Sequence, residues 1–272
     1  MPTFLQIDPV IFSCGPFVVR WYGLMYIFGF IACYLLVSYQ AKKINWRVLL
    51  KHIDNLNLSL MIGVIIGGRL GYVLLYNLPY YLGHPLEIFA TWQGGMSFHG
   101  GGIGMLAAGM LYCRFHQLDF WKVIDMYAVT VPIGLGFGRI GNFINGELYG
   151  RTTDLAWGIV FPGGGPHPRH PSQLYEALLE GVVLFILLWS LKEKTWSDDN
   201  KQKKPWPHGS MLALCLILYG IFRFFVEFFR EPDAHLGLVL FGLTMGQLLC
   251  AFMTGLGILL FVYLQKKTYP NS

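Results

Sequence analysis

Long apolar runs alternate with short polar stretches along the whole chain, and this pattern predicts membrane-spanning helices. An apolar run of about 20 residues is long enough to cross a bilayer as a helix. Seven runs approach or exceed that length, and they cover residues 18–40, 54–77, 95–114, 122–143, 172–191, 209–229 and 238–264. We therefore expect an all-α polytopic membrane protein in which residues 1–272 form one integral membrane domain with seven transmembrane helices.

The polar segments between the seven apolar runs predict the orientation of the helices. All eleven lysines follow the first, third, fifth and seventh runs, and Lys and Arg are enriched in cytoplasmic loops. The N-terminus is then outside and the C-terminus is cytoplasmic. Residues 144–171 become a short external segment, and residues 192–208 become a cytoplasmic linker whose lysines can approach anionic headgroups.

The composition supports a membrane protein and argues against several other classes. With 54% hydrophobic residues, 13% charged residues and a mean hydropathy of +0.49, the chain is too apolar for an ordinary soluble domain. The net charge of +5 is concentrated in the loops of one side, so it does not indicate nucleic-acid binding. The five cysteines are scattered, with no C-x-x-C and no histidine at metal-ligand spacing. We expect no metal, no cofactor and no nucleic-acid partner.

The stretch GLGFGRIGNFINGELYGR, residues 134–151, places polar side chains at the end of an apolar run. Arg139, Asn142, Asn145 and Glu147 lie there. A charge at that depth costs several kcal/mol and is usually kept for function. An arginine fork beside amide donors suits a phosphate.

Two other interpretations of this stretch compete with a phosphate site. Residues 136–141 match the dinucleotide fingerprint G-x-G-x-x-G, but a true case follows a buried strand and opens a soluble helix. Alternatively, Gly134 and Gly138 form a helix-packing motif, and Arg139 is a structural ion-pair partner. Glycines that recur every four residues in the second and third runs (Gly63, Gly67, Gly71, Gly100 and Gly104) favour close helix packing as well.

The predicted orientation puts the polar residues of several runs at one level, in the outer half of the membrane. They are Tyr22, Arg69, His99, Arg139, Asn142, Gln173, Tyr175, Glu176, Glu180, Tyr219, Arg223, Glu227 and Arg230, with His170 just outside. A channel or carrier would more often place polar residues near the midplane or on both sides. The one-sided pattern therefore predicts a polar cavity open to the outer leaflet.

The charges at this level nearly balance. Arg69, Arg139, Arg223 and Arg230 are expected to face Glu147, Glu176, Glu180 and Glu227. Helical spacing lets Glu227 pair with Arg223 or Arg230. An anionic ligand could then leave without exposing a bare positive cluster.

Motifs of ordinary hydrolases and nucleotide-binding enzymes are absent from the sequence: there is no H-E-x-x-H, no G-x-S-x-G and no Walker A motif. Arginine, histidine, tyrosine and glutamate remain for chemistry, and they can bind a phosphate and move a proton. These residues alone leave open a lipid transferase, a lipid-phosphate transporter and a structural scaffold.

Six blocks of the sequence resemble the bacterial prolipoprotein diacylglyceryl transferase family. They are WYGLMY (21–26), GGRLGYVLLYN (67–77), GGMSFHGG (94–101), GRIGNFINGELYGR (138–151), RHPSQLYEALLEG (169–181) and YGIFRFFVEFFREPD (219–233). The resemblance implies a transferase of the bacterial inner membrane that moves the diacylglyceryl group of phosphatidylglycerol to the thiol of the lipobox cysteine in a prolipoprotein signal peptide. A thioether forms, glycerol 1-phosphate leaves, and the site faces the external leaflet. This reaction is the first step of lipoprotein maturation.

The resemblance also assigns roles to residues, and the charge and depth of Arg69 and Glu176 add these two residues. The expected catalytic residues are Tyr22, His99, Arg139 and Arg223. The residues expected to bind phosphatidylglycerol are Arg139, Asn142, Glu147, Gly150, Tyr219 and Arg223. The residues expected to support them by ion pairing are Arg69, Glu176, Glu227 and Arg230. His99 is a hypothetical base for the thiol, and the field of the arginines is a second route to thiol activation. The alternative function is an outer-leaflet transporter or binding protein for anionic phospholipids.

Overall fold

The structure is a computed structural model that describes residues 7–15, 17–91, 94–196, 205–231, 238–240 and 242–268. The predicted cytoplasmic linker, residues 192–208, therefore lies partly outside the described residues. In chain order the elements are β1 (Val10–Cys14), β2 (Phe17–Arg20), α1 (Trp21–Lys43), α2 (Arg47–Tyr76), α3 (Leu78–Gly83), η1 (Pro85–Phe89), α4 (Phe98–Phe115), α5 (Phe120–Ile144), α6 (Ser172–Glu176), η3 (Ala177–Val183), α7 (Leu184–Leu191), η4 (Lys192–Thr195), α8 (Ser210–Val226), β3 (Leu238–Leu240), β4 (Leu243–Thr244) and α9 (Met245–Thr268).

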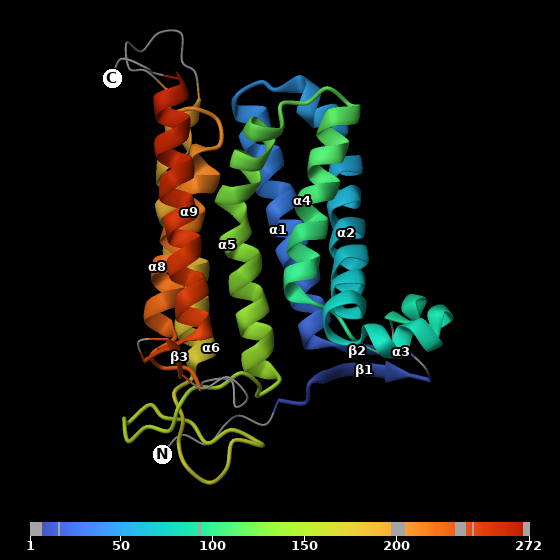
Figure 1. Cartoon of the computed structure of the whole chain (residues 1–272), viewed down its shortest axis with the longest axis vertical. Coiled ribbons are helices and arrows are strands. Elements are labelled where there is room, and N and C mark those ends of the chain that lie inside the picture. The colour runs from blue at the N-terminus through green and yellow to red at the C-terminus, as the bar shows by residue number, and fades with distance from the viewer. Residues whose placement is uncertain are drawn as a thin grey trace. The chain divides into compact units, whose positions relative to one another are not determined.

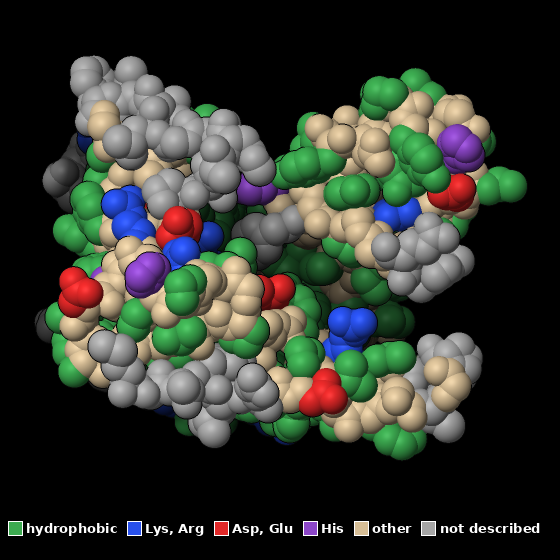
Figure 2. All heavy atoms as spheres, turned by 90° about the horizontal axis from the view of Figure 1, so that it is seen from below, with side chains coloured by type: hydrophobic (Ala, Val, Ile, Leu, Met, Phe, Trp, Pro, Cys, Tyr) green, Lys and Arg blue, Asp and Glu red, His purple; other side chains and the backbone are tan. Residues whose placement is uncertain are grey.

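The helices have the length and composition of a polytopic membrane protein. Within the described residues, five helical segments are long and apolar enough to cross a membrane: α1, α2, α5, the continuous segment Ser172–Thr195 and α9. The helix α8 is apolar but shorter, with 17 residues. Many large apolar side chains are exposed on these helices, and several patches of hydrophobic side chains lie on the face shown in Figure 2. Such a surface fits a lipid environment better than water.

Each of the seven predicted apolar runs overlaps a helix, but two run boundaries were wrong. The first run was expected to begin at residue 18, where β2 pairs antiparallel with β1 around Gly15, whose φ is +59°. The last run was expected to begin at residue 238, where β3 and β4 form a second hairpin and α9 begins only at Met245. An all-α expectation missed both hairpins because apolar strands and apolar helices look alike in hydropathy.

Contacts between the helices divide the chain into two compact units. The first unit contains Met1–Val37 and Ile124–Ser272, and the second contains Ser38–Val123. In the second unit α2 packs closely against α4 (Figure 1). A Cβ atom added to Gly71 would lie 2.7 Å from the Gly100 Cα atom, and one added to Gly67 would meet the backbone of Gly100 and Gly104. The predicted glycine packing of these two helices is therefore confirmed.

In the first unit, glycines of α5 allow two neighbours to approach its backbone. A Cβ on Gly29 of α1 would lie 3.1 Å from the Gly134 Cα, and a Cβ on Gly181 of η3 would lie 2.8 Å from the Gly136 Cα. The structure does not support the packing interpretation of Gly134 and Gly138 themselves, because a Cβ on either glycine would meet nothing within 4 Å. The core of this unit lies where α5, α7 and α8 meet, around Val129, Leu184, Leu188 and Met211.

The helix that begins at Ser172 contains a wide turn that carries an acidic residue. Its residues Ala177–Val183 are π-helical, between α6 and α7. Short π-helical insertions are rare and often lie at functional sites. Here the insertion carries Glu180 and follows Glu176, which is the last residue of α6.

Candidate functional site

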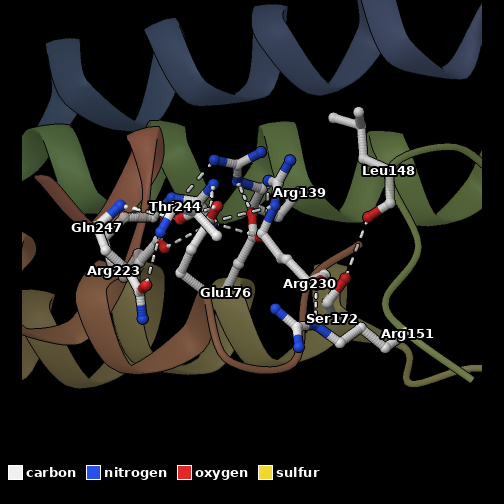
Figure 3. Close-up of polar contacts among 11 residues, drawn as sticks. Arg139, Leu148, Arg151, Ser172, Glu176, Arg223, Arg230, Thr244 and Gln247 are labelled. Atoms are coloured by element: carbon white, nitrogen blue, oxygen red, sulfur yellow. Dashed lines mark hydrogen bonds and ion pairs between the residues drawn. The ribbon is translucent and has the colours of Figure 1, made fainter. Parts of the chain in front are cut away.

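Three arginines of the first unit converge on one buried carboxylate (Figure 3). Glu176 forms ion pairs with the Nε atom of Arg139 at 2.5 Å and the Nη1 atom of Arg223 at 2.9 Å, and it accepts a hydrogen bond from the Nη1 atom of Arg230 at 3.1 Å. The arginines come from α5, from α8 and from the turn after α8. The support role expected for Glu176 therefore has a clear geometric basis.

A second buried carboxylate lies one turn further along the same helix. Glu180 places one oxygen 3.7 Å from Arg139 Nη2 and the other 3.7 Å from Arg223 Nη1. Its side chain is 0% exposed, and neither oxygen has a hydrogen-bond partner among the described residues. Glu180 thus contributes negative charge to the arginines with little hydrogen bonding.

Glu227 completes this arginine–glutamate cluster, which consists of Arg139, Arg223, Arg230, Glu176, Glu180 and Glu227. Its Oε2 atom lies 3.1 Å from Arg223 Nη2 and 3.5 Å from Arg230 Nε. The expectation that Glu227 can pair with either arginine is confirmed, since it pairs with both. The six formal charges cancel, three positive against three negative.

Burial differs between the two signs of charge in the cluster. The arginine side chains are 14–17% exposed, whereas Glu176 and Glu180 are 1% and 0% exposed. Each guanidinium carries five N–H donors in a fixed fork. The arginines are therefore the more accessible part of the cluster, and Glu176 and Glu180 are its most deeply buried members.

The start of α9 supports Glu227, and sequence reasoning missed this contact. The Thr244 hydroxyl donates to Glu227 Oε1 at 3.2 Å. Thr244 also forms a capping box with Gln247, because Thr244 Oγ1 accepts from the Gln247 N–H at 3.2 Å and Gln247 Oε1 accepts from the Thr244 N–H at 3.0 Å. The T-x-x-Q spacing was a readable signal for this helix start.

The amides after Arg139 bind a carboxylate of their own. Asn142 Nδ2 donates to Glu147 Oε1 at 2.9 Å, and Asn145 Nδ2 donates to the same oxygen at 3.2 Å. The backbone carbonyl of Glu147 accepts from Gln173 Nε2 at 2.6 Å. Glu147 was expected to face arginines, but the contacts described for its carboxylate are to these two amides.

Gly150 lets the segment after α5 run directly beside Arg230. Its N–H donates to the His170 carbonyl at 2.9 Å, and it forms an isolated antiparallel bridge with Arg230. A Cβ at Gly150 would collide with the Phe229 carbonyl and with His170. These contacts give Gly150 a packing role, which is separate from the lipid contact expected of it.

The neighbouring His170 side chain is partly buried, and this burial lowers its pKa from the usual value.

The two expected site tyrosines of the first unit lie on different helices. The Tyr22 hydroxyl is 3.2 Å from the Tyr26 hydroxyl on α1, and a Cβ on Gly141 would lie 2.9 Å from the Tyr22 ring. Tyr219 on α8 packs against the hydrophobic core and lies within electrostatic range of Arg139 and Arg223. Tyr22 thus packs against α5 at Gly141, which lies close to Arg139 in the sequence. Tyr219 borders the cluster.

His99 and Arg69 belong to the second unit. His99 is exposed in the first turn of α4, where Ser97 caps the helix by accepting from the Gly100 N–H at 3.2 Å. Arg69 is 4% exposed. It donates to the carbonyls of Glu87, Ile88, Gly94 and Gly95 at 2.6–3.1 Å. Arg69 was expected to give ion-pair support, but these contacts fix the loop before α4 through carbonyl groups.

Comparison with known proteins gives this arrangement a context. The model of a family described as prolipoprotein diacylglyceryl transferase matches residues 9–263. A relative from Desulfotalea psychrophila, named phosphatidylglycerol–prolipoprotein diacylglyceryl transferase, is 55% identical over 261 residues, which are 96% of this chain and 94% of the relative. Relatives of the same name from Geobacter sulfurreducens and Pseudoalteromonas atlantica are each 51% identical and cover 97% of this chain, and the matches span 98% and 92% of their own lengths.

Proposed function

The chain belongs to the prolipoprotein diacylglyceryl transferase family, and on that premise we propose that it transfers the diacylglyceryl group of phosphatidylglycerol to the thiol of a prolipoprotein cysteine. This is the first step of lipoprotein maturation. The observation that carries the proposal is the match over residues 9–263 together with relatives more than 50% identical over nearly the whole chain. The acceptor is the lipobox cysteine of the signal peptide.

The arginine–glutamate cluster supports specific roles for its arginines in this reaction. The substrate sulfur attacks the glyceryl carbon that bears the phosphate. A carbon–sulfur bond forms, the carbon–oxygen bond breaks, and the electron pair leaves with glycerol 1-phosphate. Arg139 and Arg223 bind the phosphate and stabilise the charge on the departing oxygen. The ion pairs of both partly exposed arginine side chains with the buried Glu176 carboxylate support this assignment.

The remaining site residues complete the proposal. Asn142, Glu147, Gly150 and Tyr219 hold the lipid headgroup and its surroundings, and Tyr22 borders the reacting groups. The thiol proton goes to His99. A free thiol with a pKa near ~8.5 is mostly protonated at neutral pH, and an exposed histidine is suited to remove that proton.

The proposed setting is the bacterial inner membrane, with seven spans, an external N-terminus, a cytoplasmic C-terminus and a single membrane domain. A polar cavity opens to the external leaflet, where phosphatidylglycerol and the signal peptide enter. All eleven lysines lie in the loops of one predicted side of the membrane, and this distribution supports the orientation. The five long apolar helical segments and the shorter α8 support a multi-pass membrane protein, and α4 (Phe98–Phe115) is the proposed seventh span.

An assay with purified full-length protein tests the proposed reaction. The protein is placed in phosphatidylglycerol vesicles with a lipobox peptide, and lipid consumption and glycerol phosphate release are measured. We expect both only with the cysteine peptide, and neither with a peptide in which serine replaces that cysteine. Movement of phosphatidylglycerol between leaflets without its consumption would instead support a transporter.

A further inference from the structure

We propose that the buried carboxylates of Glu176 and Glu180 act as an internal counter-anion, which competes with the phosphate for Arg139 and Arg223 and thereby releases the product. The inference rests on the proposed function and deepens it. It treats both glutamates as positioning residues, because they reach the substrate only through the arginines.

The first observation is the number of arginines on one acid. Glu176 lies within 2.5–3.1 Å of nitrogen atoms of Arg139, Arg223 and Arg230. Replacing buried ion pairs by apolar groups is often neutral or stabilising. Stability is therefore a weak explanation for two fully buried glutamates on one helix, and a functional explanation is needed.

The second observation is the contrast between the two glutamates. Glu176 orients the arginines through short contacts, whereas Glu180 stands 3.7 Å from Arg139 and from Arg223. The Glu180 oxygens have no hydrogen-bond partner among the described residues. Glu180 therefore acts on the arginines through its charge and leaves their N–H donors available to a ligand.

The charges of substrate and product make this arrangement useful. A phosphodiester headgroup carries one negative charge, whereas a phosphate monoester carries about 1.5 to 2 at pH 7. A cluster with excess positive charge would hold the product more tightly than the substrate. Because the three glutamates cancel the three arginines, the cluster favours the departure of the more highly charged product.

The test measures product affinity in full-length protein. Glu180→Gln keeps the shape of the side chain and removes its charge. We expect the inhibition constants of glycerol 1-phosphate and inorganic phosphate to fall about tenfold or more, since a unit charge a few ångströms away changes the energy by several kcal/mol before screening. We also expect a fast first turnover followed by slower steady-state turnover, because product release becomes limiting.

Two further variants keep the test decisive. Glu176→Gln also removes one negative charge and should also tighten product binding, but it should slow the first turnover as well because it loosens Arg139 and Arg223. It serves as the charge test if Glu180→Gln does not fold. Glu231→Gln is the matched control: Glu231 pairs with Arg169 at 2.5 Å outside the cluster, and its removal should change neither inhibition constant.

The outcomes separate this inference from the proposed function. Wild-type protein without transferase activity would overturn the proposed function. Active wild-type protein, combined with a folded Glu180→Gln or Glu176→Gln variant whose inhibition constants are unchanged or higher, would overturn the counter-anion role and leave the proposed function standing.

Discussion

The Nε atom of Arg139 lies 2.5 Å from a carboxylate oxygen of Glu176. This ion pair holds one edge of the Arg139 guanidinium in place. Its Nη2 atom stays 3.7 Å from Glu180, beyond ordinary hydrogen-bond distance. The same arginine is thus anchored firmly on one side and loosely held on the other. This asymmetry suits a side chain that must bind and release an anion without losing its orientation.

The first prediction concerns the fork of Arg139. Arg139→Lys keeps the positive charge but loses the planar group that can contact Glu176 and a phosphate together. We expect transfer to fall roughly a hundredfold or more, as for the loss of one transition-state donor, while the protein still inserts into membranes. Arg47→Lys is the control, since Arg47 is exposed at the start of α2 and should tolerate the change. Near-normal transfer by Arg139→Lys would make Arg139 a structural ion-pair partner only.

The second prediction concerns the backbone contact at Gly150. In Gly150→Ala the new Cβ meets the Phe229 carbonyl and His170, so the segment around Gly150 must move away from Arg230. We expect a loss of stability of about 1–3 kcal/mol and a lower transfer rate, measured by thermal unfolding in detergent and by activity. Gly138→Ala, whose Cβ would meet nothing within 4 Å, should change neither. Equal behaviour of the two variants would contradict a packing role for Gly150.

The third prediction concerns His99 as the base. His99→Gln retains a hydrogen-bonding side chain but cannot titrate, so we expect the rate to collapse at neutral pH. The rate should partly recover under alkaline conditions, as the substrate thiol ionises by itself. His84→Gln, which changes another exposed histidine of the same unit, should keep the wild-type pH profile. Retention of most activity by His99→Gln at neutral pH would assign thiol activation to the arginine field.

The fourth prediction concerns orientation. Single cysteines are introduced by Asp154→Cys and Lys203→Cys in a chain without its own cysteines, and intact cells are treated with an impermeant thiol reagent. The external segment should be labelled at position 154, and position 203 should react only after lysis. Labelling of position 203 but not of position 154 from outside would reverse the topology.

The sequence was a good guide to the helices because hydropathy reports burial in lipid directly. It could not locate the hairpins β1–β2 and β3–β4, whose apolar residues extend the runs of the adjoining helices. It also gave no sign of the π-helical turn at Ala177–Val183. At that turn α5 lies close to the helix, with Gly136 against Gly181.

The charged residues of the site could be predicted from their depth, but their partners could not. Helical spacing was enough for Glu227 with Arg223 and Arg230, since these contacts are local. The convergence on Glu176 involves separate helices, and only tertiary structure reveals it. Arg69 had the same sequence signature as the other arginines, yet it binds the carbonyls of a neighbouring loop.

A structure of the full-length protein with bound phosphatidylglycerol tests the central claim most directly. The proposal predicts lipid phosphate oxygens within about 3.2 Å of guanidinium nitrogens of both Arg139 and Arg223, with Glu176 still in contact with Arg139 from behind. A headgroup phosphate bound elsewhere, with both arginines still in contact only with the glutamates of the cluster, would contradict it.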